Sequence, residues 1–517
     1  MSKQQVETVE PPAAAADPTP RSPREIRLVM IGLVVAMLLA MLDNLIVGTA
    51  MPTIVGDLGG AEHLSWVVTA YTLATAASTP IWGKLGDLYG RKGTFVISIA
   101  IFLLGSALSG LSQTMGQLIA FRAVQGLGAG GLMVGVMSIM GALVAPRDRG
   151  KYQGMFAAVM ALATVGGPLI GGFITDHLSW HWTFYINLPL GVVALAFIVV
   201  TLKLPTVRSK AKIDYLGAVL LTVGITSLVL ITTWGGQEYE WASKQILGLT
   251  ALAVASLIGF VYAEQKAEEP MLPLDLFRNR NFTMVSVIGF IVGFAMFGAV
   301  TFLPLYQQHV QGASATSSGL QLMPMMFGML VVSLVVGQAI TKTGKYRIYP
   351  IIGTAVMAGG SLLLSTLSTD TDRFVSSCYM VVLGAGMGFL MQVTMLVAQN
   401  SVELKDMGVA SSTATLFRTI GGSFGVALFG ALFNDRVTST MAGAGVQGGG
   451  HGNIAQLGPE AVRALPAPVQ DAFHHAVANG IHTVFIWGAV ISLVAVAASV
   501  FLREVPLRGA GEPVLSE

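Results

Sequence analysis

Residues 28–50 read LVMIGLVVAMLLAMLDNLIVGTA, an apolar run interrupted by a single charged side chain, that of Asp43. A bilayer core about 30 Å thick needs roughly 20 apolar residues in a helix, so this run predicts a membrane-spanning helix. The strands of a membrane barrel are roughly 10 residues long and alternate in polarity, which this run does not. The stretch therefore predicts an α-helical membrane protein.

The composition of the whole chain agrees with that reading. Of 517 residues, 53% are hydrophobic and 11% are charged, whereas a soluble domain carries about 25% charged residues. The net charge of +2 excludes a global basic surface for nucleic acid. The single cysteine, Cys378, excludes a disulfide framework or a cysteine-based metal site within one chain. We predict a lipid bilayer as solvent and no metal, cofactor or nucleic-acid partner.

Fourteen windows are long and apolar enough to span a membrane, which predicts an all-α polytopic protein. They are residues 28–50, 64–82, 94–112, 115–137, 154–175, 182–202, 215–234, 245–263, 282–306, 317–341, 348–367, 374–400, 407–433 and 480–502. With this count, 23 of the 29 lysine and arginine residues lie on the side of the two termini and four on the other side. Because cytoplasmic loops are rich in lysine and arginine, we predict a multi-pass protein of the cell (inner) membrane with both termini cytoplasmic.

An internal repeat divides the chain into two related parts. TAMPTIV (49–55) matches TFLPLYQ (301–307) at an offset of 252, and GKLGDLYGRK (83–92) matches GQAITKTGK (337–345) at 254. A glycine pair recurs at an offset of 255, from Gly166–Gly167 to Gly421–Gly422. Transporters often carry such duplicated halves. The repeat predicts two pseudo-symmetric six-helix bundles with two helices inserted between them.

The predicted organisation follows from these windows. Residues 1–27 are expected to form a disordered cytoplasmic tail and residues 28–203 the N-terminal bundle. Residues 204–265 hold the two inserted helices, and residues 266–281 form a cytoplasmic linker. Residues 282–503 form the C-terminal bundle with a long outer loop at 434–480, and residues 504–517 form a second cytoplasmic tail.

The loop after the second window carries a glycine-rich, charged string, GKLGDLYGRK. Its glycines allow a tight turn and close approach of helix ends, and its aspartate can meet a helix N-terminus or an arginine. The string resembles the signature G-x-L-a-D-r-x-G-r-k of the major facilitator superfamily. The residues expected to act as a conformational latch are Gly83, Asp87, Gly90, Arg91 and Lys92.

RAVQGLGAG at 122–130 is similar to the superfamily's second signature, and GGPLIGG at 166–172 resembles the signature of its antiporters. LD–IV–AMP at 42–52 and WHWTFYINLP at 180–189, with His181 in place of Arg, resemble strings of the fourteen-span drug:proton antiporter branch. The resemblance implies two bundles that rock about a central cavity, with proton uptake driving export. In its antiporters, GGPLIGG is thought to seal the cavity against leak; close packing alone is the alternative for Gly166, Gly167, Pro168, Gly171 and Gly172. Asn44 and Gly48 depart from this branch, which often has Thr and Asn there.

Asp43 is the one carboxylate well inside a predicted span. A charge in lipid is costly, so such a residue is a functional candidate by default. Counting about 1.5 Å per residue along the two helices places Arg122 at a similar depth. We hypothesise that Asp43 carries the coupling proton and that Arg122 responds to its charge.

Arg418 also lies within a span, with no carboxylate in the second bundle's spans to pair with it. Three roles stay open for it: bonding backbone carbonyls, pairing with substrate, or reaching across to the other bundle. Candidates for lining a substrate cavity are aromatic and amide residues, each of which can instead face a neighbouring helix. With Arg418, they are Asn44, Trp66, Tyr71, Gln125, Tyr306, Gln307 and Gln392.

The predicted function is a proton-coupled antiporter that acts as a monomer and exports small amphipathic compounds such as drugs or antibiotics. The alternative is an exporter of one endogenous metabolite, lipid or siderophore. The sequence has no H-E-x-x-H string, nucleotide-binding P-loop or cysteine pair. These absences argue against an enzyme and against direct use of ATP.

Overall fold

The structure, a computed structural model, describes residues 23–59, 64–144, 146–202, 214–236, 238–403, 406–443, 462 and 465–507. Within these ranges the chain is built from α-helices, and the only β pairing is an isolated bridge. The all-α prediction is therefore confirmed. Of the two predicted tails, residues 1–22 and 508–517 lie outside the described residues.

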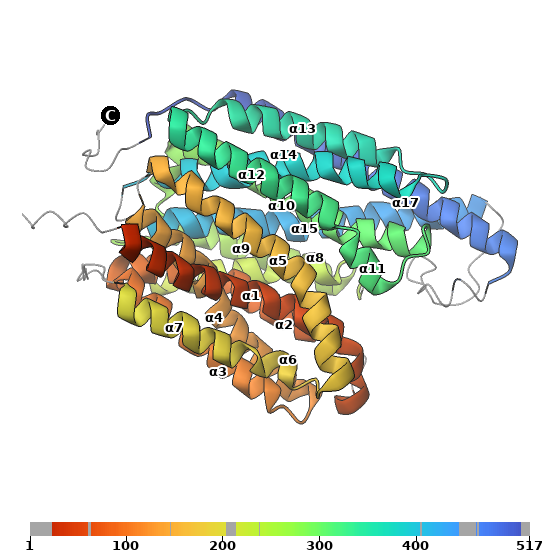
Figure 1. The fold of residues 1–517 in the computed structure, drawn as a ribbon, viewed down its shortest axis with the longest axis horizontal. Helices are drawn as coiled ribbons and strands as arrows, with labels where there is room; N and C mark the ends of the chain where they lie inside the picture. Colours follow the sequence, from red (N-terminus) through yellow and green to blue (C-terminus); the bar gives the residue numbers. More distant parts are fainter. Residues whose placement is uncertain are drawn as a thin grey trace, which may run out of the picture.

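Two helical halves flank an inserted pair (Figure 1). The N-half comprises α1 (Pro23–Leu58), α2 (Leu64–Tyr89), α3 (Arg91–Gly110), α4 (Met115–Leu143), α5 (Pro146–His177), α6 (Trp182–Tyr185) and α7 (Asn187–Thr201). The inserted pair is α8 (Tyr215–Trp234) and α9 (Lys244–Glu264), followed by the short 3-10 helix η2 (Leu274–Arg278). The C-half comprises α10 (Arg280–His309), α11 (Ala315–Leu320), α12 (Met323–Thr343), α13 (Ile348–Ser365), α14 (Arg373–Asn400), α15 (Met407–Gly443) and α17 (Ala467–Val500).

Thirteen segments of the described chain are long and apolar enough to cross a membrane. The remaining predicted span, 64–82, forms α2, a helix of 26 residues. Its lower hydropathy comes from hydroxyl side chains that face the bundle: Thr75 Oγ1 donates to the Gly126 carbonyl at 3.1 Å and Ser78 Oγ to that of Leu127 at 3.2 Å. α4 therefore satisfies hydroxyl groups of α2 that would be costly in lipid. With 26 residues, α2 is long enough to cross a membrane.

The helices extend past several predicted boundaries. α1 begins at Pro23, inside the predicted tail 1–27. The predicted outer loop 434–480 is corrected, because α15 continues to Gly443 and α17 begins at Ala467. Hydropathy windows end at the first charged residues, such as Asp435, whereas a helix continues through polar residues at a cost of at most about 0.7 kcal/mol each.

The two halves repeat one packing pattern. In the N-half α4 packs on α2 and α3, and α1 packs on α5 and α7; in the C-half α14 packs on α12 and α13, and α10 packs on α15 and α17. The turns between α2 and α3 and between α12 and α13 each contain a glycine of positive φ, Gly90 at 96° and Gly344 at 70°. These are the glycines that the sequence repeat aligns, so the repeat is structural.

The inserted pair covers the seam between the halves. α8 contacts both α2 of the N-half and α15 of the C-half. A hydrophobic cluster joins the three elements with the linker after α9: Ala76, Leu221, Ile225, Val229, Phe260, Met271, Leu272, Val409 and Leu416. Polar contacts fix the linker beside α2, since Glu264 accepts the N–H groups of Met271 and Leu272 and Lys84 pairs with Glu269 at 3.0 Å.

Both ends of the described chain lie at one end of the molecule, on the left in Figure 1. We call this the tail end; it carries the start of α1, the α2–α3 turn and residues 502–507. The helices run along the long axis from the tail end to the opposite end, so residues in the middle of a helix lie far from both ends of the molecule.

Candidate functional site

Asp43 lies at the centre of a buried polar network in the N-half. Its side chain and that of Arg122 are both 0% exposed, and Arg122 Nη1 donates to Asp43 Oδ2 at 2.5 Å. The other carboxylate oxygen accepts from Gln125 Nε2 and from Asn187 Nδ2, each at 2.7 Å. The network therefore joins α1, α4 and α7 through one carboxyl group.

Arg122 is held on several sides besides its ion pair. Its guanidinium donates to the side-chain oxygens of Gln125 at 2.9 Å and Asn44 at 3.2 Å. The Tyr71 ring lies 4.1 Å from the guanidinium carbon, within cation–π range. A buried ion pair offsets its desolvation only when further hydrogen bonds complete it, and that condition is met here.

A second layer of the network lies where α6 passes into α7. Ile186 stands between the two helices with helical dihedral angles, and Asn187 is the first residue of α7. Asn187 Nδ2 also donates to Ser106 Oγ at 2.9 Å, and that hydroxyl donates to the Phe184 carbonyl at 2.9 Å. The string WHWTFYINLP contained Asn187, but the sequence analysis did not select it. A lone amide in an apolar window two residues before a proline was the available signal.

Three of the residues predicted to line a substrate cavity, Asn44, Tyr71 and Gln125, lie instead around Asp43 and Arg122. Trp66 packs edge-to-face on Trp234 of the inserted helix α8, with ring centroids 5.3 Å apart.

Tyr306 and Gln307 belong to the core of the C-half. The Tyr306 hydroxyl donates to the Ser368 carbonyl at 2.7 Å. Gln307 is buried with its amide nitrogen 3.8 Å from Met380 Sδ. The remaining two candidates, Gln392 and Arg418, line one cavity.

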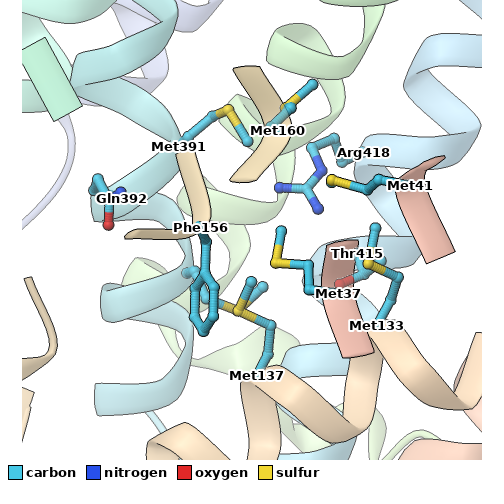
Figure 2. Close-up of a pocket in the computed structure, with 11 residues that line it drawn as sticks. Met37, Met41, Met133, Met137, Phe156, Met160, Met391, Gln392, Thr415 and Arg418 are labelled. Atoms are coloured by element: carbon cyan, nitrogen blue, oxygen red, sulfur yellow. The ribbon is translucent and has the colours of Figure 1, made fainter. Parts of the chain in front are cut away.

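That cavity lies between the halves and has a volume of about 50 Å³ (Figure 2). Its walls come from α1, α4 and α5 of the N-half and from α14 and α15 of the C-half. The lining residues are Met37, Met41, Met133, Met137, Phe156, Met160, Met391, Gln392, Met395, Thr415 and Arg418. Among the described residues, no three His, Cys, Asp or Glu side chains gather where they could hold a metal ion.

The predicted latch contacts both halves at the tail end. Asp87 accepts the backbone N–H groups of Gly408 at 3.1 Å and Val409 at 3.0 Å, in the first turn of α15. Arg91 donates to the same carboxylate at 2.9 Å. Asp87 lies beyond the predicted span 64–82, and burial raises its pKa to about 6 against the lowering effect of Arg91. The contact joins a carboxylate to a helix N-terminus, where the backbone N–H groups are free to donate.

The other latch residues shape this contact. A Cβ atom on Gly83 would lie 2.8 Å from the Gly408 carbonyl oxygen and 2.7 Å from Ser412 Cβ, so only glycine lets α2 approach α15 this closely. Gly90 provides the positive φ of the turn. Lys92 donates to the Val199 carbonyl at 2.8 Å and so stays within the N-half.

A second contact across the halves, which the sequence analysis missed, lies near the latch. The buried Arg149 donates to Gln399 Oε1 at 3.0 Å and to the Val144 carbonyl at 2.9 Å. Gln399 in turn donates to the Met137 carbonyl at 3.1 Å. Charged residues in loops are common, so nothing in the sequence marked Arg149 as buried. Together with the Asp87 contact, the Arg149–Gln399 contact links the two halves at the tail end.

The GGPLIGG string lies on α5 where that helix meets α1. A Cβ atom on Gly167 would clash with Leu45, and one on Gly171 would clash with Thr49 and lie 3.0 Å from the Ile46 carbonyl oxygen. By contrast, a Cβ on Gly172 would meet no atom within 4 Å, and one on Gly166 would make only ordinary contacts. The Pro168 side chain lies outside the described residues. Small residues here permit close helix packing.

Comparison with known proteins gives a consistent family. Residues 33–426 match the Major Facilitator Superfamily. Multidrug transporter protein MdtP of Bacillus subtilis (strain 168) is 40% identical over 507 residues, covering 93% of this chain and 93% of its own. Multidrug resistance protein 3 of the same organism is 39% identical over 442 residues, covering 85% and 86%. Efflux pump FUS6 of Gibberella moniliformis is 34% identical over 464 residues, covering 86% and 82%.

Solved structures of low sequence identity share the fold. The human organic anion transporter MFSD10 superposes with a TM-score of 0.61 at 13% identity, covering 93% of this chain and 100% of its own. The proton:xylose symporter XylE superposes with a TM-score of 0.58 at 16% identity, covering 92% and 95%. At such identities the likeness concerns architecture alone.

Proposed function

Because the chain belongs to the major facilitator superfamily, we propose that it exports small amphipathic compounds, drugs or antibiotics among them, by proton antiport through Asp43. It is a multi-span membrane transporter, and its family and relatives are transporters, a class distinct from enzymes. Relatives named as multidrug transporters and efflux pumps support the direction and the breadth of the substrate range. In this proposal the chain works as a monomer with its tail end in the cytoplasm.

The observation that carries the proposal is the fully buried Asp43–Arg122 pair. When Asp43 takes a proton, Arg122 loses the negative charge that compensates it, and a buried unpaired cation is strongly unfavourable. The guanidinium must then rely on neutral acceptors such as Gln125 and Asn44. Proton binding thus changes the forces that hold α1 against α4 and α7.

The same helices reach the cavity. Met37 and Met41 of α1, and Met133 and Met137 of α4, form part of its wall. A shift of α1 against α4 on protonation would change the cavity directly. Alternating access also requires the contacts of Asp87 and Arg149 with the C-half to break, because they link the two halves at the tail end.

The test is transport in proteoliposomes that hold the purified protein and a pH gradient. Amphipathic cationic, neutral and anionic fluorophores are assayed with and without a protonophore. Asp43→Asn should abolish gradient-driven transport while the protein stays folded by thermal unfolding. Transport of many compounds favours a drug exporter, and transport of a single one favours an exporter of one endogenous metabolite, lipid or siderophore.

Asp57→Asn is the matched control, because it makes the same change on the same helix. Asp57 accepts the Trp180 indole N–H at 2.8 Å, and an asparagine oxygen can accept it too. This variant should transport like the wild type. Full gradient-driven transport by Asp43→Asn would contradict the assignment of the proton site.

A further inference from the structure

Arg418 of α15 directs its guanidinium into the central cavity, among Met37, Met41 and Met160 (Figure 2). Within the part of the chain that the structure describes, no hydrogen bond or ion pair joins this guanidinium to another residue. Of the three roles left open by the sequence, bonding to carbonyls has no contact among the described residues, and reaching to the other half brings the guanidinium only beside methionine side chains of α1 and α5. We infer that the cavity binds the anionic group of an amphipathic substrate and that Arg418 is its counter-ion.

The walls supply no negative charge to this cation. Seven of the eleven lining residues are methionines, and none of the eleven is acidic. Asp43 does not serve Arg418, because its two oxygens already accept from Arg122, Gln125 and Asn187. Arg418 is partly buried, and a guanidinium held among apolar side chains without an acceptor is costly, so an anionic ligand would remove that cost.

A second unsatisfied group belongs to Gln392, which lines the same cavity. The Gln392 amide N–H donates to Ser333 Oγ. The Gln392 carbonyl oxygen is buried and has no hydrogen-bond partner among the described residues. It can accept a hydroxyl or amide N–H from a substrate whose acidic group meets Arg418.

The remaining wall favours an apolar substrate body. Methionine side chains are flexible and polarizable, and they contact aromatic rings favourably. Phe156 adds one aromatic face. The chemical class that fits is therefore an apolar, ring-containing carboxylate, sulfonate or acidic phenol, whereas a permanently cationic amphiphile is repelled by Arg418.

The cavity must widen before it can hold such a molecule. Its volume of about 50 Å³ lies well below the roughly 300–1,000 Å³ of a typical small-molecule site. Because the walls come from both halves, separation of the halves enlarges the cavity and leaves Arg418 on one wall. The inference rests on the proposed function, since it names the substrate class of the same transporter.

Two fluorescent probes that differ in charge test the inference in lipid nanodiscs. Dansylglycine carries a carboxylate and dansylcadaverine an ammonium on the same fluorophore, and empty nanodiscs correct for lipid binding. The wild type should bind dansylglycine at least about tenfold more tightly than dansylcadaverine. Arg418→Gln should weaken dansylglycine binding about 10- to 100-fold, since a charge-assisted bond is lost. Arg418→Lys, which keeps the charge, should restore part of the affinity.

Arg436→Gln is the matched control, because Arg436 is exposed on the same helix; its affinity for both probes should equal that of the wild type. Unchanged dansylglycine affinity in Arg418→Gln, or preference of the wild type for dansylcadaverine, would overturn the inference. If Arg418→Gln does not fold, the charge preference of the wild type decides. Arg418-dependent binding without gradient-driven transport would refute the proposed efflux function and leave the anion site standing.

Discussion

In the N-half, the buried carboxylate of Asp43 accepts hydrogen bonds from three side chains, whereas in the C-half the Arg418 guanidinium has no partner among the described residues. The repeat places small apolar residues at the corresponding sites. At an offset of 252 the counterpart of Asp43 is Ala295, and at an offset of 255 that of Arg418 is Ala163. Both alanines are buried. The same helix packing thus holds a carboxylate with three hydrogen-bond donors in the N-half and, in the C-half, a guanidinium without a hydrogen-bond partner in the described part of the chain.

The two interhelical turns that the repeat aligns, α2–α3 and α12–α13, also differ in their contacts. The α2–α3 turn reaches into the C-half through Asp87. In the α12–α13 turn, the N–H groups of Tyr346 and Arg347 donate to Glu504, at the C-terminal end of the same half. The carboxylate that contacts the other half, Asp87, therefore comes from the N-half. The N-half also holds the Asp43–Arg122 ion pair, whereas the C-half contributes Arg418 to the cavity wall.

The largest expected effect separates Arg122 from Arg418. Arg122→Gln leaves the Asp43 carboxylate buried without its cation and should lower the free energy of unfolding by about 3–5 kcal/mol. Arg418→Met removes a cation that has no partner and should leave stability unchanged or raise it by about 1–3 kcal/mol. Thermal and denaturant unfolding in detergent measure both. An equal loss of unfolding free energy in the two variants would show that Arg418 has a stabilising partner. It would then contradict the proposed difference between the halves.

A smaller effect concerns closure of the tail end. Gly83→Ala places a methyl group against Gly408 and Ser412 and should shift the protein toward an open tail end. In a Cys378→Ser background, a cysteine at Thr415 in the cavity wall should react with a maleimide about tenfold faster. Gly93→Ala is the control, because a Cβ there meets no atom within 4 Å. Unchanged labelling of the Gly83→Ala protein would argue against a latch at this contact.

The smallest effect is the pH dependence of the latch. Burial raises the pKa of Asp87 from 3.8 to about 6 in the closed tail end, whereas an exposed carboxyl in the open state keeps the lower value. The closed state therefore binds the proton more tightly. Its stabilisation by Asp87 is fully present below about pH 4 and is lost as the pH rises through about 6.

Labelling of the same cysteine at position 415, normalised to unfolded protein, should accordingly increase about three- to tenfold between pH 5 and pH 7.5. In Asp87→Asn that increase should disappear, because the amide does not titrate. A pH dependence that persists in Asp87→Asn would assign it to another group.

Sequence reasoning reached the helices, the repeat and the Asp43–Arg122 juxtaposition, because each depends on local composition or on helix rise. It did not find Asn187 or Arg149. Asn187 reaches Asp43 because α7 packs against α1. Arg149 meets Gln399, which lies 250 residues later in the chain. Both contacts require tertiary packing, which no local pattern encodes.

The sequence by itself determined that this protein resides in lipid as two related sets of helices, because bilayer thickness and the cost of an unsatisfied backbone leave apolar runs of this length no other structure. Only the tertiary structure decided which polar groups satisfy one another. Asn44 and Tyr71 contact Arg122, and Gln125 donates to Asp43. Arg418 instead lines the cavity. Hydrogen bonds act over about 3 Å, so their pairing depends on how helices distant in sequence are packed.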